Sequence, residues 1–157
     1  MSGDDSEDGL AMRGGAATWL LRAALQARTT GEGDRRPAIL VVEDEAATRR
    51  VFATFLRRRG FDVLEAEHGQ SALLMARRTE PDVIVLDIQM PVLDGVTTAE
   101  LLKLDASTAH IPLIAVTGHP FPGGEEEARR YGFAAYLPKP LAPDELAEAI
   151  ATLLETA

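Results

Sequence analysis

Cysteine is absent from the 157-residue sequence. Disulfides, zinc–thiolate centres and iron–sulfur clusters all require cysteine, so the sequence excludes these chemistries and fits a reducing compartment. Long apolar runs are also absent, because no stretch reaches the length of about 18 residues that a membrane-spanning helix needs. The N-terminus is acidic where a secretory signal would be basic. We therefore expect a cytoplasmic protein that neither crosses a membrane nor is secreted.

The charge of the chain is one-sided, with a formal net charge of −9. An acidic surface repels the phosphates of DNA, and the sequence carries no recognisable DNA-reading motif. Direct DNA binding is therefore not expected. Hydrophobic residues make up 46% of the chain and charged residues 26%, a balance that is normal for a globular protein with a packed core.

Two parts of the chain differ in composition. Residues 1–15 are rich in glycine, serine and acidic residues, which predicts disorder, whereas residues 16–28 have the apolar spacing of a short helix. Turn-forming residues follow as far as Pro37. We therefore predict an N-terminal extension at 1–36, largely disordered apart from this helix, and one globular domain at 37–157.

Within the globular part, apolar runs alternate with segments of helical periodicity. The predicted strands are 39–42, 61–66, 83–86, 113–116 and 134–137. The predicted helices are 46–59, 71–79, 97–104, 125–131 and 143–154. Five strands, each followed by a helix, form a parallel sheet that is covered on both faces, so we predict a doubly wound α/β fold.

The first predicted helix of the globular part, 46–59, has a core face that its apolar residues predict. Its apolar residues lead us to expect that Val51, Phe55 and Leu56 face the core. Gly60 is well placed to end this helix, since glycine is common just after a helix C-terminus.

Polar side chains stand at the points where four of the predicted strands end. Glu43 and Asp44 follow the first strand, Asp87 follows the third, Thr117 the fourth and Lys139 the fifth. In a doubly wound sheet, functional groups gather at the carboxyl ends of the strands. We therefore expect three carboxylates, one hydroxyl and one ammonium group to converge on a single edge of the sheet.

Such a cluster of carboxylates predicts a cation. Three carboxylates within a few ångströms repel one another strongly unless a positive charge lies between them. Mg²⁺ prefers hard oxygen ligands and keeps some of its waters, so two or three carboxylates and a backbone carbonyl suit it. Lys139 can offset the charge of a phosphoryl group that arrives at the metal, and the Thr117 hydroxyl can donate to a phosphoryl oxygen.

Four segments of the sequence resemble the signature segments of response-regulator receiver domains. They are VVEDE at 41–45, VLDIQMPVLDG at 85–95, LIAVTG at 113–118 and YLPKP at 136–140. The separations also agree with that family, with 43 residues from Asp44 to Asp87, 30 from there to Thr117, and 22 from there to Lys139. The resemblance covers about residues 38 to 155, which is the whole predicted globular part.

The resemblance implies a flavodoxin-like fold, with a five-stranded parallel sheet in the order 2-1-3-4-5 and helices on both faces. It also implies that Asp87 accepts a phosphoryl group from a sensor histidine kinase or a histidine phosphotransfer protein. Glu43, Asp44 and Asp87 would hold Mg²⁺ together with the backbone carbonyl of Gln89. Lys139 would contact the phosphoryl group.

The resemblance further implies a phosphorylation switch. Thr117 matches the hydroxyl residue that moves toward the phosphoryl group, and Tyr136 matches the aromatic residue that changes rotamer on activation. Output would pass through the surface formed by segments 125–131, 134–137 and 143–154. This surface would bind an unknown downstream protein, or a second copy of the chain in a phosphorylation-linked dimer. Because the sequence ends just after the last helix, we expect a stand-alone regulator.

Some positions are specific to this sequence. Position 43 is Glu where many receivers have Asp, and we still expect Mg²⁺ binding there. Gln89 and His119 occupy two positions that border the path of the hydrolytic water in the family, so we expect them to tune the lifetime of the acyl phosphate. The resemblance also implies a cis peptide bond between Lys139 and Pro140.

Two other classes of protein compete with this interpretation. Phosphatases of the haloacid-dehalogenase type also phosphorylate an aspartate at a strand end, but they need a second Asp two residues later as general acid. Gln89 stands there and cannot protonate a leaving group, so we expect no enzyme, only self-catalysed phosphotransfer and slow autodephosphorylation. The alternative is a receiver-like interaction module that works without phosphorylation, although such a module would normally lack one of the five key side chains. A receiver domain that is detached from a hybrid kinase is a further alternative.

Overall fold

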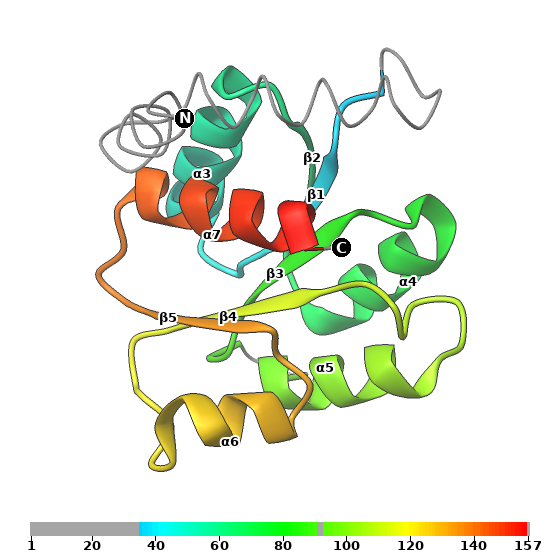
Figure 1. The fold of residues 1–157 in the computed structure, drawn as a ribbon, viewed down its shortest axis with the longest axis vertical. Coiled ribbons are helices and arrows are strands. Elements are labelled where there is room, and N and C mark those ends of the chain that lie inside the picture. The colour runs from blue at the N-terminus through cyan, green and yellow to red at the C-terminus, as the bar shows by residue number, and fades with distance from the viewer. Residues whose placement is uncertain (1–34, 91–92, 157) are drawn as a thin grey trace, which may run out of the picture.

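The computed structural model describes residues 35–90 and 93–156. In this part of the chain, five strands form one sheet in the order β2-β1-β3-β4-β5 (Figure 1). The strands are β1 (Ala38–Val42), β2 (Asp62–Ala66), β3 (Val83–Asp87), β4 (Leu113–Thr117) and β5 (Ala135–Pro138). The helices are α3 (Ala46–Arg58), α4 (Gly69–Thr79), α5 (Gly95–Leu104), α6 (Gly124–Arg130) and α7 (Pro143–Thr156). The predicted helix at 16–28 and the predicted disorder before it lie outside the described residues.

All four strand pairings are parallel, and their order is the order 2-1-3-4-5 that the resemblance implied. Helices α3 and α7 cover one face of the sheet, and α4, α5 and α6 cover the other (Figure 1). This arrangement confirms the flavodoxin-like, doubly wound α/β fold. The predicted bounds of the strands and helices differ from the observed ones by at most two residues.

The alternation of side chains along each strand divides the core into two halves. In β1, Ile39 and Val41 pack under α3 and α7, whereas Leu40 and Val42 pack under α4, α5 and α6. Successive side chains of a strand point to opposite faces, and both faces of this sheet are covered, so every position has to be apolar. This explains the continuous apolar runs in the sequence.

Helix α5 begins two residues earlier than the apolar pattern predicts. The Asp94 carboxylate accepts a hydrogen bond from the backbone N–H of Thr97 at 2.8 Å, which caps the helix start. At Gly95, an added Cβ would lie 2.5 Å from the carbonyl oxygen of Asp87, which is too close for any other residue without movement. Gly95 therefore allows α5 to start directly against the end of β3.

The prediction for the core face of α3 was partly wrong. Leu56 is fully buried and Phe55 partly buried, but Val51 is 56% exposed. The buried apolar residues of this helix are Phe52, Ala53 and Leu56, which follow the spacing i, i+1, i+4 of a single helix face. Val51 lies one residue, or about 100°, away from Phe52 around the helix, so it faces solvent.

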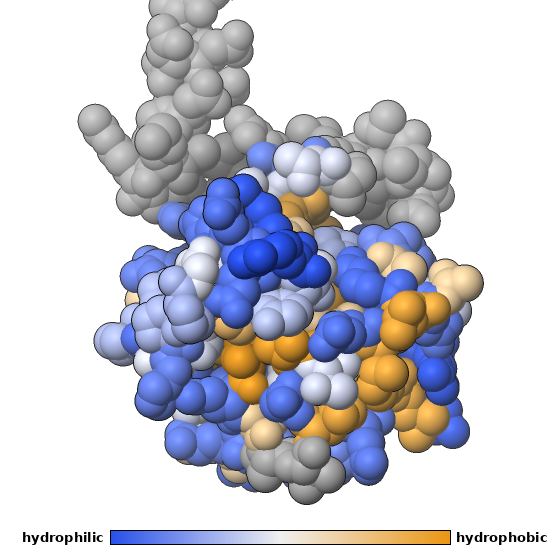
Figure 2. Space-filling view, turned by 90° about the horizontal axis from the view of Figure 1, so that it is seen from below, coloured by the Kyte–Doolittle hydropathy of each residue, from blue (hydrophilic) through white to orange (hydrophobic). Residues whose placement is uncertain are grey.

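The surface of the domain carries both hydrophilic and apolar side chains. No helix in residues 35–90 or 93–156 is both long and apolar enough to pass through a bilayer. Figure 2, which looks at the side of α5 and α6, shows apolar side chains gathered among hydrophilic ones on that face. The large apolar side chains that are exposed in the described part of the chain are Val51, Leu74, Leu101 and Leu104.

The corrected core face of α3 gives a direct test by unfolding. We expect Leu56→Ala to lower the free energy of unfolding by about 2–5 kcal/mol, because it leaves a cavity in the core. Val51→Ala should change it by less than about 0.5 kcal/mol, because that side chain is mostly in solvent. Urea titrations followed by circular dichroism measure both values. Equal losses in the two variants would contradict the observed orientation of α3.

Candidate functional site

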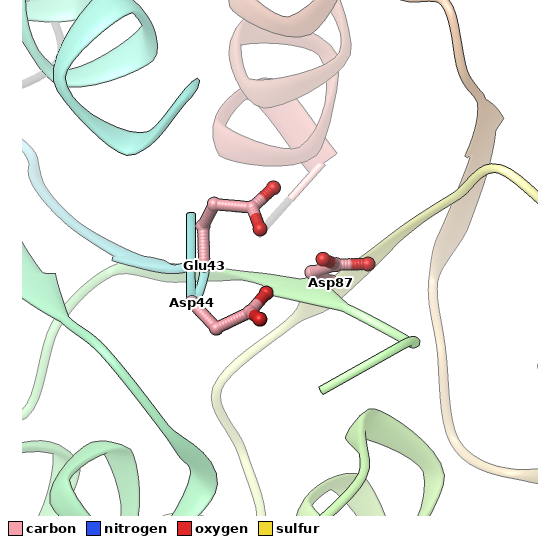
Figure 3. A group of neighbouring side chains, drawn as sticks. All are labelled: Glu43, Asp44 and Asp87. Carbon is pink, nitrogen blue, oxygen red and sulfur yellow. The ribbon is translucent and has the colours of Figure 1, made fainter. Parts of the chain in front are cut away.

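The site begins with three carboxylates at one edge of the sheet. Strands β1 and β3 are neighbours, with Val42 opposite Leu86, so the residues that follow them meet at the same edge. Each of Glu43, Asp44 and Asp87 offers a carboxylate oxygen, and these oxygens all lie within 4.8 Å of one another. Figure 3 shows the three side chains directed toward a common space. The structure therefore brings together the three acids that the sequence predicted to meet.

The three carboxylates differ in their contact with solvent. Glu43 is only 4% exposed and Asp87 5% exposed, whereas Asp44 is exposed. Burial raises the pKa of Glu43, and the neighbouring Asp87 raises it further, while the hydrogen bond from Lys139 acts in the opposite direction. The pocket thus holds more negative charge than it can easily tolerate without a cation.

Lys139 supplies part of the compensating positive charge. Its Nζ lies 2.9 Å from Glu43 Oε1 and 3.4 Å from Asp87 Oδ2. Burial alone would lower the pKa of Lys139, but the bonds and charges of these two carboxylates raise it above its ordinary value. The Lys139 backbone N–H donates to Thr117 O at 2.8 Å, and the peptide bond between Lys139 and Pro140 is cis, as the family resemblance implied.

Backbone amides hold the two buried carboxylates in place. The N–H of Gln89 donates to Asp87 Oδ1 at 3.1 Å, and the N–H of Glu45 donates to Glu43 Oε2 at 3.3 Å. Each of these carboxylates has its other oxygen directed to Lys139. Both side chains therefore have a defined orientation before any ligand binds.

Thr117 lies at the same edge but its hydroxyl bonds to its own loop. It is fully buried, and it follows Val116, which pairs with Asp87 in the sheet. Its Oγ1 donates to His119 O at 2.9 Å and accepts from the N–H of His119 at 3.1 Å. The side chains of Gln89 and His119, both singled out from the sequence, form a hydrogen bond through Nε2 and Nδ1.

Tyr136 lies on β5, beside this edge. Its ring centroid is 5.6 Å from that of Phe121, and it packs against the core half under α4, α5 and α6. Among the described residues, its hydroxyl is a buried side-chain oxygen with no hydrogen-bond partner. Buried hydroxyls usually have a hydrogen-bond partner, which makes the Tyr136 hydroxyl an exception among the described residues.

Arg49 also lies at this site, although no sequence pattern predicted it as a site residue. This arginine is 7% exposed and donates a hydrogen bond from Nη1 to the backbone carbonyl of Glu43 at 2.8 Å. The available signal was its helical spacing: Arg49 lies three residues before Phe52 and seven before Leu56, on the buried face of α3. Charged residues are rarely buried without partners, and Arg49 has two carboxylate partners, Glu65 and Glu67, in addition to the Glu43 carbonyl.

The donor set suits a hard divalent cation. All three side chains offer carboxylate oxygens, which Mg²⁺ prefers, and the exposed Asp44 leaves one side open to water. Within the described part of the chain, the Lys139 ammonium group forms ion pairs with Glu43 and Asp87 and not with Asp44. On the chemistry of these groups, the residues fit a magnesium ion.

Comparisons with known proteins agree with this geometry. The family model described as the response regulator receiver domain matches residues 39–151. Among curated proteins, the polar-differentiation response regulator DivK of Brucella anthropi is 34% identical over 117 residues, which cover 74% of this chain and 95% of DivK. The DivK of Brucella ovis shows the same identity and coverage.

Solved structures show the same fold. Chemotaxis protein CheY4 of Vibrio cholerae superposes with a TM-score of 0.72 at 25% identity, covering 76% of this chain and 99% of CheY4. The receiver domain of sensor histidine kinase PA1611 from Pseudomonas aeruginosa has a TM-score of 0.70 at 29% identity, covering 77% and 99%. That structure holds a magnesium ion coordinated in its active site cleft.

The raised pKa of Glu43 gives a pH-dependent prediction for the metal-free protein. A carboxyl whose pKa is higher in the folded state than its ordinary value of 4.5 makes the folded state less stable as the pH rises above that value. In EDTA, Glu43→Gln should therefore be more stable than the wild type at neutral pH, and the difference should shrink as the pH falls toward 4.5. Urea midpoints measured across this range provide the test.

A matched control for this prediction is Glu126→Gln on the exposed surface of α6. It should leave the pH dependence of the urea midpoint as in the wild type. If Glu43→Gln were less stable than the wild type at every pH, the ion pair with Lys139 would outweigh the effect of burial.

Proposed function

The chain belongs to the family of response regulator receiver domains, and we propose that it accepts a phosphoryl group on Asp87 in the presence of Mg²⁺. The family consists of signalling proteins rather than classical enzymes, and its members interact with histidine kinases or phosphotransfer proteins. The observation that carries the proposal is the meeting of Asp87 with Glu43, Asp44 and Lys139 at one edge of the sheet.

The surroundings of Asp87 support its role as acceptor. The residue ends the central strand β3, and one carboxylate oxygen accepts from the Gln89 N–H while the other lies near Lys139. Both bonds hold the carboxylate in one orientation, which favours in-line attack on an incoming phosphorus. Lys139 can then move its contact from the carboxylate to a phosphoryl oxygen, since its three donors rotate freely.

We assign the metal to Glu43, Asp44 and Asp87, with the backbone carbonyl of Gln89 as a further ligand. When bound, Mg²⁺ would neutralise charge that develops on the phosphoryl oxygens. The residues of the chain supply the rest, because they orient the acceptor oxygen and place Lys139 beside it. Glu43 has one more methylene than aspartate, and its link to Lys139 at 2.9 Å shows the reach that this extra length provides.

The phosphoryl donor is a phosphohistidine on a sensor histidine kinase or a histidine phosphotransfer protein. In the transfer, the phosphorus–nitrogen bond of the donor breaks, and the imidazole nitrogen keeps the electron pair. A new bond forms between phosphorus and an oxygen of Asp87. Catalysis consists of positioning and charge neutralisation, without a protein-bound intermediate before the acyl phosphate.

The switch runs through Thr117 and Tyr136. The phosphoryl dianion attracts the Thr117 hydroxyl, which exchanges its bonds to His119 for one to a phosphoryl oxygen. The space that Thr117 leaves is then open to the Tyr136 ring, whose hydroxyl has no hydrogen-bond partner among residues 35–90 and 93–156. This exchange biases an equilibrium between two arrangements of the surface formed by α6, β5 and α7.

That surface is the proposed output site for a downstream protein. A surface pocket of about 260 Å³ lies between α6 and β5, and Tyr136 is one of its lining residues, together with Arg129 and Phe133. A change in the Tyr136 rotamer would therefore alter the shape of a concave surface where a partner can bind. Phosphorylation of Asp87 would therefore change the affinity for the partner, although the partner makes no direct contact with Asp87.

The phosphorylation itself can be measured by intact mass. After incubation with a small acyl phosphate and Mg²⁺, the wild-type protein should gain the mass of one phosphoryl group, and Asp87→Asn should gain none. Asp144→Asn, which changes an exposed aspartate of α7, should still gain it. A folded wild-type protein that never gains this mass would favour the alternative, an interaction module that works without phosphorylation.

The hydrogen bond between the Gln89 and His119 side chains leads to a prediction about the lifetime of the acyl phosphate on Asp87. The two side chains are bonded to each other, and the Gln89 backbone N–H donates to Asp87. We expect this pair to limit the approach of water, so Gln89→Ala and His119→Ala should each speed the loss of the phosphoryl group several-fold. Because the two side chains act as a bonded pair, the double variant should decay no faster than the faster single variant. Decay is followed by mass after removal of the donor. If Gln89→Ala and His119→Ala lost the phosphoryl group at the wild-type rate, these residues would have no role in setting its lifetime.

A further inference from the structure

Arg49 is a buried cation next to the pocket but outside the set of groups that would contact a ligand. Its guanidinium makes three contacts, each through a different nitrogen. Nη1 donates to Glu43 O at 2.8 Å, Nε lies 3.4 Å from Glu65 Oε1, and Nη2 lies 3.7 Å from Glu67 Oε1. Only 9% of the Arg49 side chain is exposed, and its bond to the Glu43 carbonyl is buried. Glu65 is 27% and Glu67 72% exposed, so the contact with Glu67 is open to solvent.

The contacts of Arg49 clamp one short segment, residues 43–45. Its side chain bonds to the carbonyl of Glu43, and its backbone N–H bonds to the carbonyl of Glu45 at 3.0 Å. On the other side, the N–H of Glu43 donates to Ala66 O at 3.1 Å, which continues the pairing of β1 with β2. Asp44, the exposed acid of the pocket, therefore lies between two carbonyls that the same arginine holds.

The two glutamates on the other side of Arg49 explain why its charge is tolerated there. A buried guanidinium needs carboxylate partners, and Glu65 at the end of β2 and Glu67 in the following loop provide them. The planar fork of arginine lets one nitrogen face the Glu43 carbonyl while the others face the glutamates. A single ammonium group could not make these divergent contacts at once.

We propose that Arg49 is a positioning residue, which orients the Glu43–Asp44 peptide so that the Asp44 carboxylate stays directed into the pocket. This inference rests on the proposed function, since it concerns the same metal site. The Glu43 carbonyl and the Asp44 N–H belong to one rigid peptide plane, so a rotation of that plane redirects the Asp44 side chain. Mg²⁺ requires near-ideal octahedral geometry, which makes its binding sensitive to such a rotation.

Arg57 provides a matched control on the same helix. Its Nη2 lies 3.1 Å from Glu65 Oε2 and donates to Val63 O at 3.1 Å, so it ties α3 to β2 just as Arg49 does. Its partners are on β2 and not in the segment 43–45. Loss of either arginine removes a partner of Glu65, but only the loss of Arg49 releases the Glu43 carbonyl.

The test compares Mg²⁺ binding by Arg49→Met, Arg57→Met and the wild type, measured by isothermal titration calorimetry on the full chain. We expect the dissociation constant to rise about tenfold in Arg49→Met, as is common when a group behind a metal ligand is lost. It should stay within about twofold of the wild type in Arg57→Met. In metal-free protein, the NMR amide resonances of Asp44 and Glu45 should shift in Arg49→Met and not in Arg57→Met.

Equal Mg²⁺ affinity in Arg49→Met and the wild type would overturn the role of Arg49 and leave the proposed function intact. A folded wild type that binds no Mg²⁺ would overturn the proposed function, and this inference with it. If circular dichroism shows that Arg49→Met does not fold, Arg49→Lys takes its place, because it keeps the charge and loses the fork. Weaker binding by Arg49→Lys supports the inference, and wild-type affinity overturns it.

Discussion

Mutual repulsion of like charges is the constraint on which the site of this domain depends. Glu43, Asp44 and Asp87 bring carboxylate oxygens within 4.8 Å of one another, and two of these residues are nearly inaccessible to solvent. In such surroundings each negative charge raises the cost of the next. Lys139 contacts two of the carboxylates and leaves the third free, so the pocket retains an excess of negative charge that a divalent cation can satisfy.

The fold makes this concentration of charge possible. Strands β1 and β3 are parallel neighbours in the sheet although α3, β2 and α4 lie between them in sequence, and their carboxyl ends therefore meet. Rigid hydrophobic packing on both faces of the sheet keeps the strands in register. Backbone amides from the loops then orient the carboxylates. The core thus stabilises an arrangement that electrostatics alone would disperse.

Particular residues show how far sequence reasoning reached. The continuous apolar runs of β1, β3 and β4 predicted buried parallel strands. The acids and the threonine at the ends of these strands, with the lysine after β5, predicted the composition of the pocket. The core face of α3 was predicted with Val51, which proved exposed, because three apolar residues in a row at Val51, Phe52 and Ala53 leave the helix rotation ambiguous by about 100°. Contact with the sheet resolves that ambiguity.

Sequence patterns were enough to predict the fold class and the identity of the groups at the strand ends, and the family resemblance added the strand order. These follow from periodicity and from motif spacing, which are local properties of the chain. The individual contacts became known from the folded chain alone. Lys139 bonds to Glu43 and Asp87, the Thr117 hydroxyl bonds to the His119 backbone, and Arg49 donates to the Glu43 carbonyl. Such contacts join separate elements, and their geometry depends on the packing of helices against the sheet.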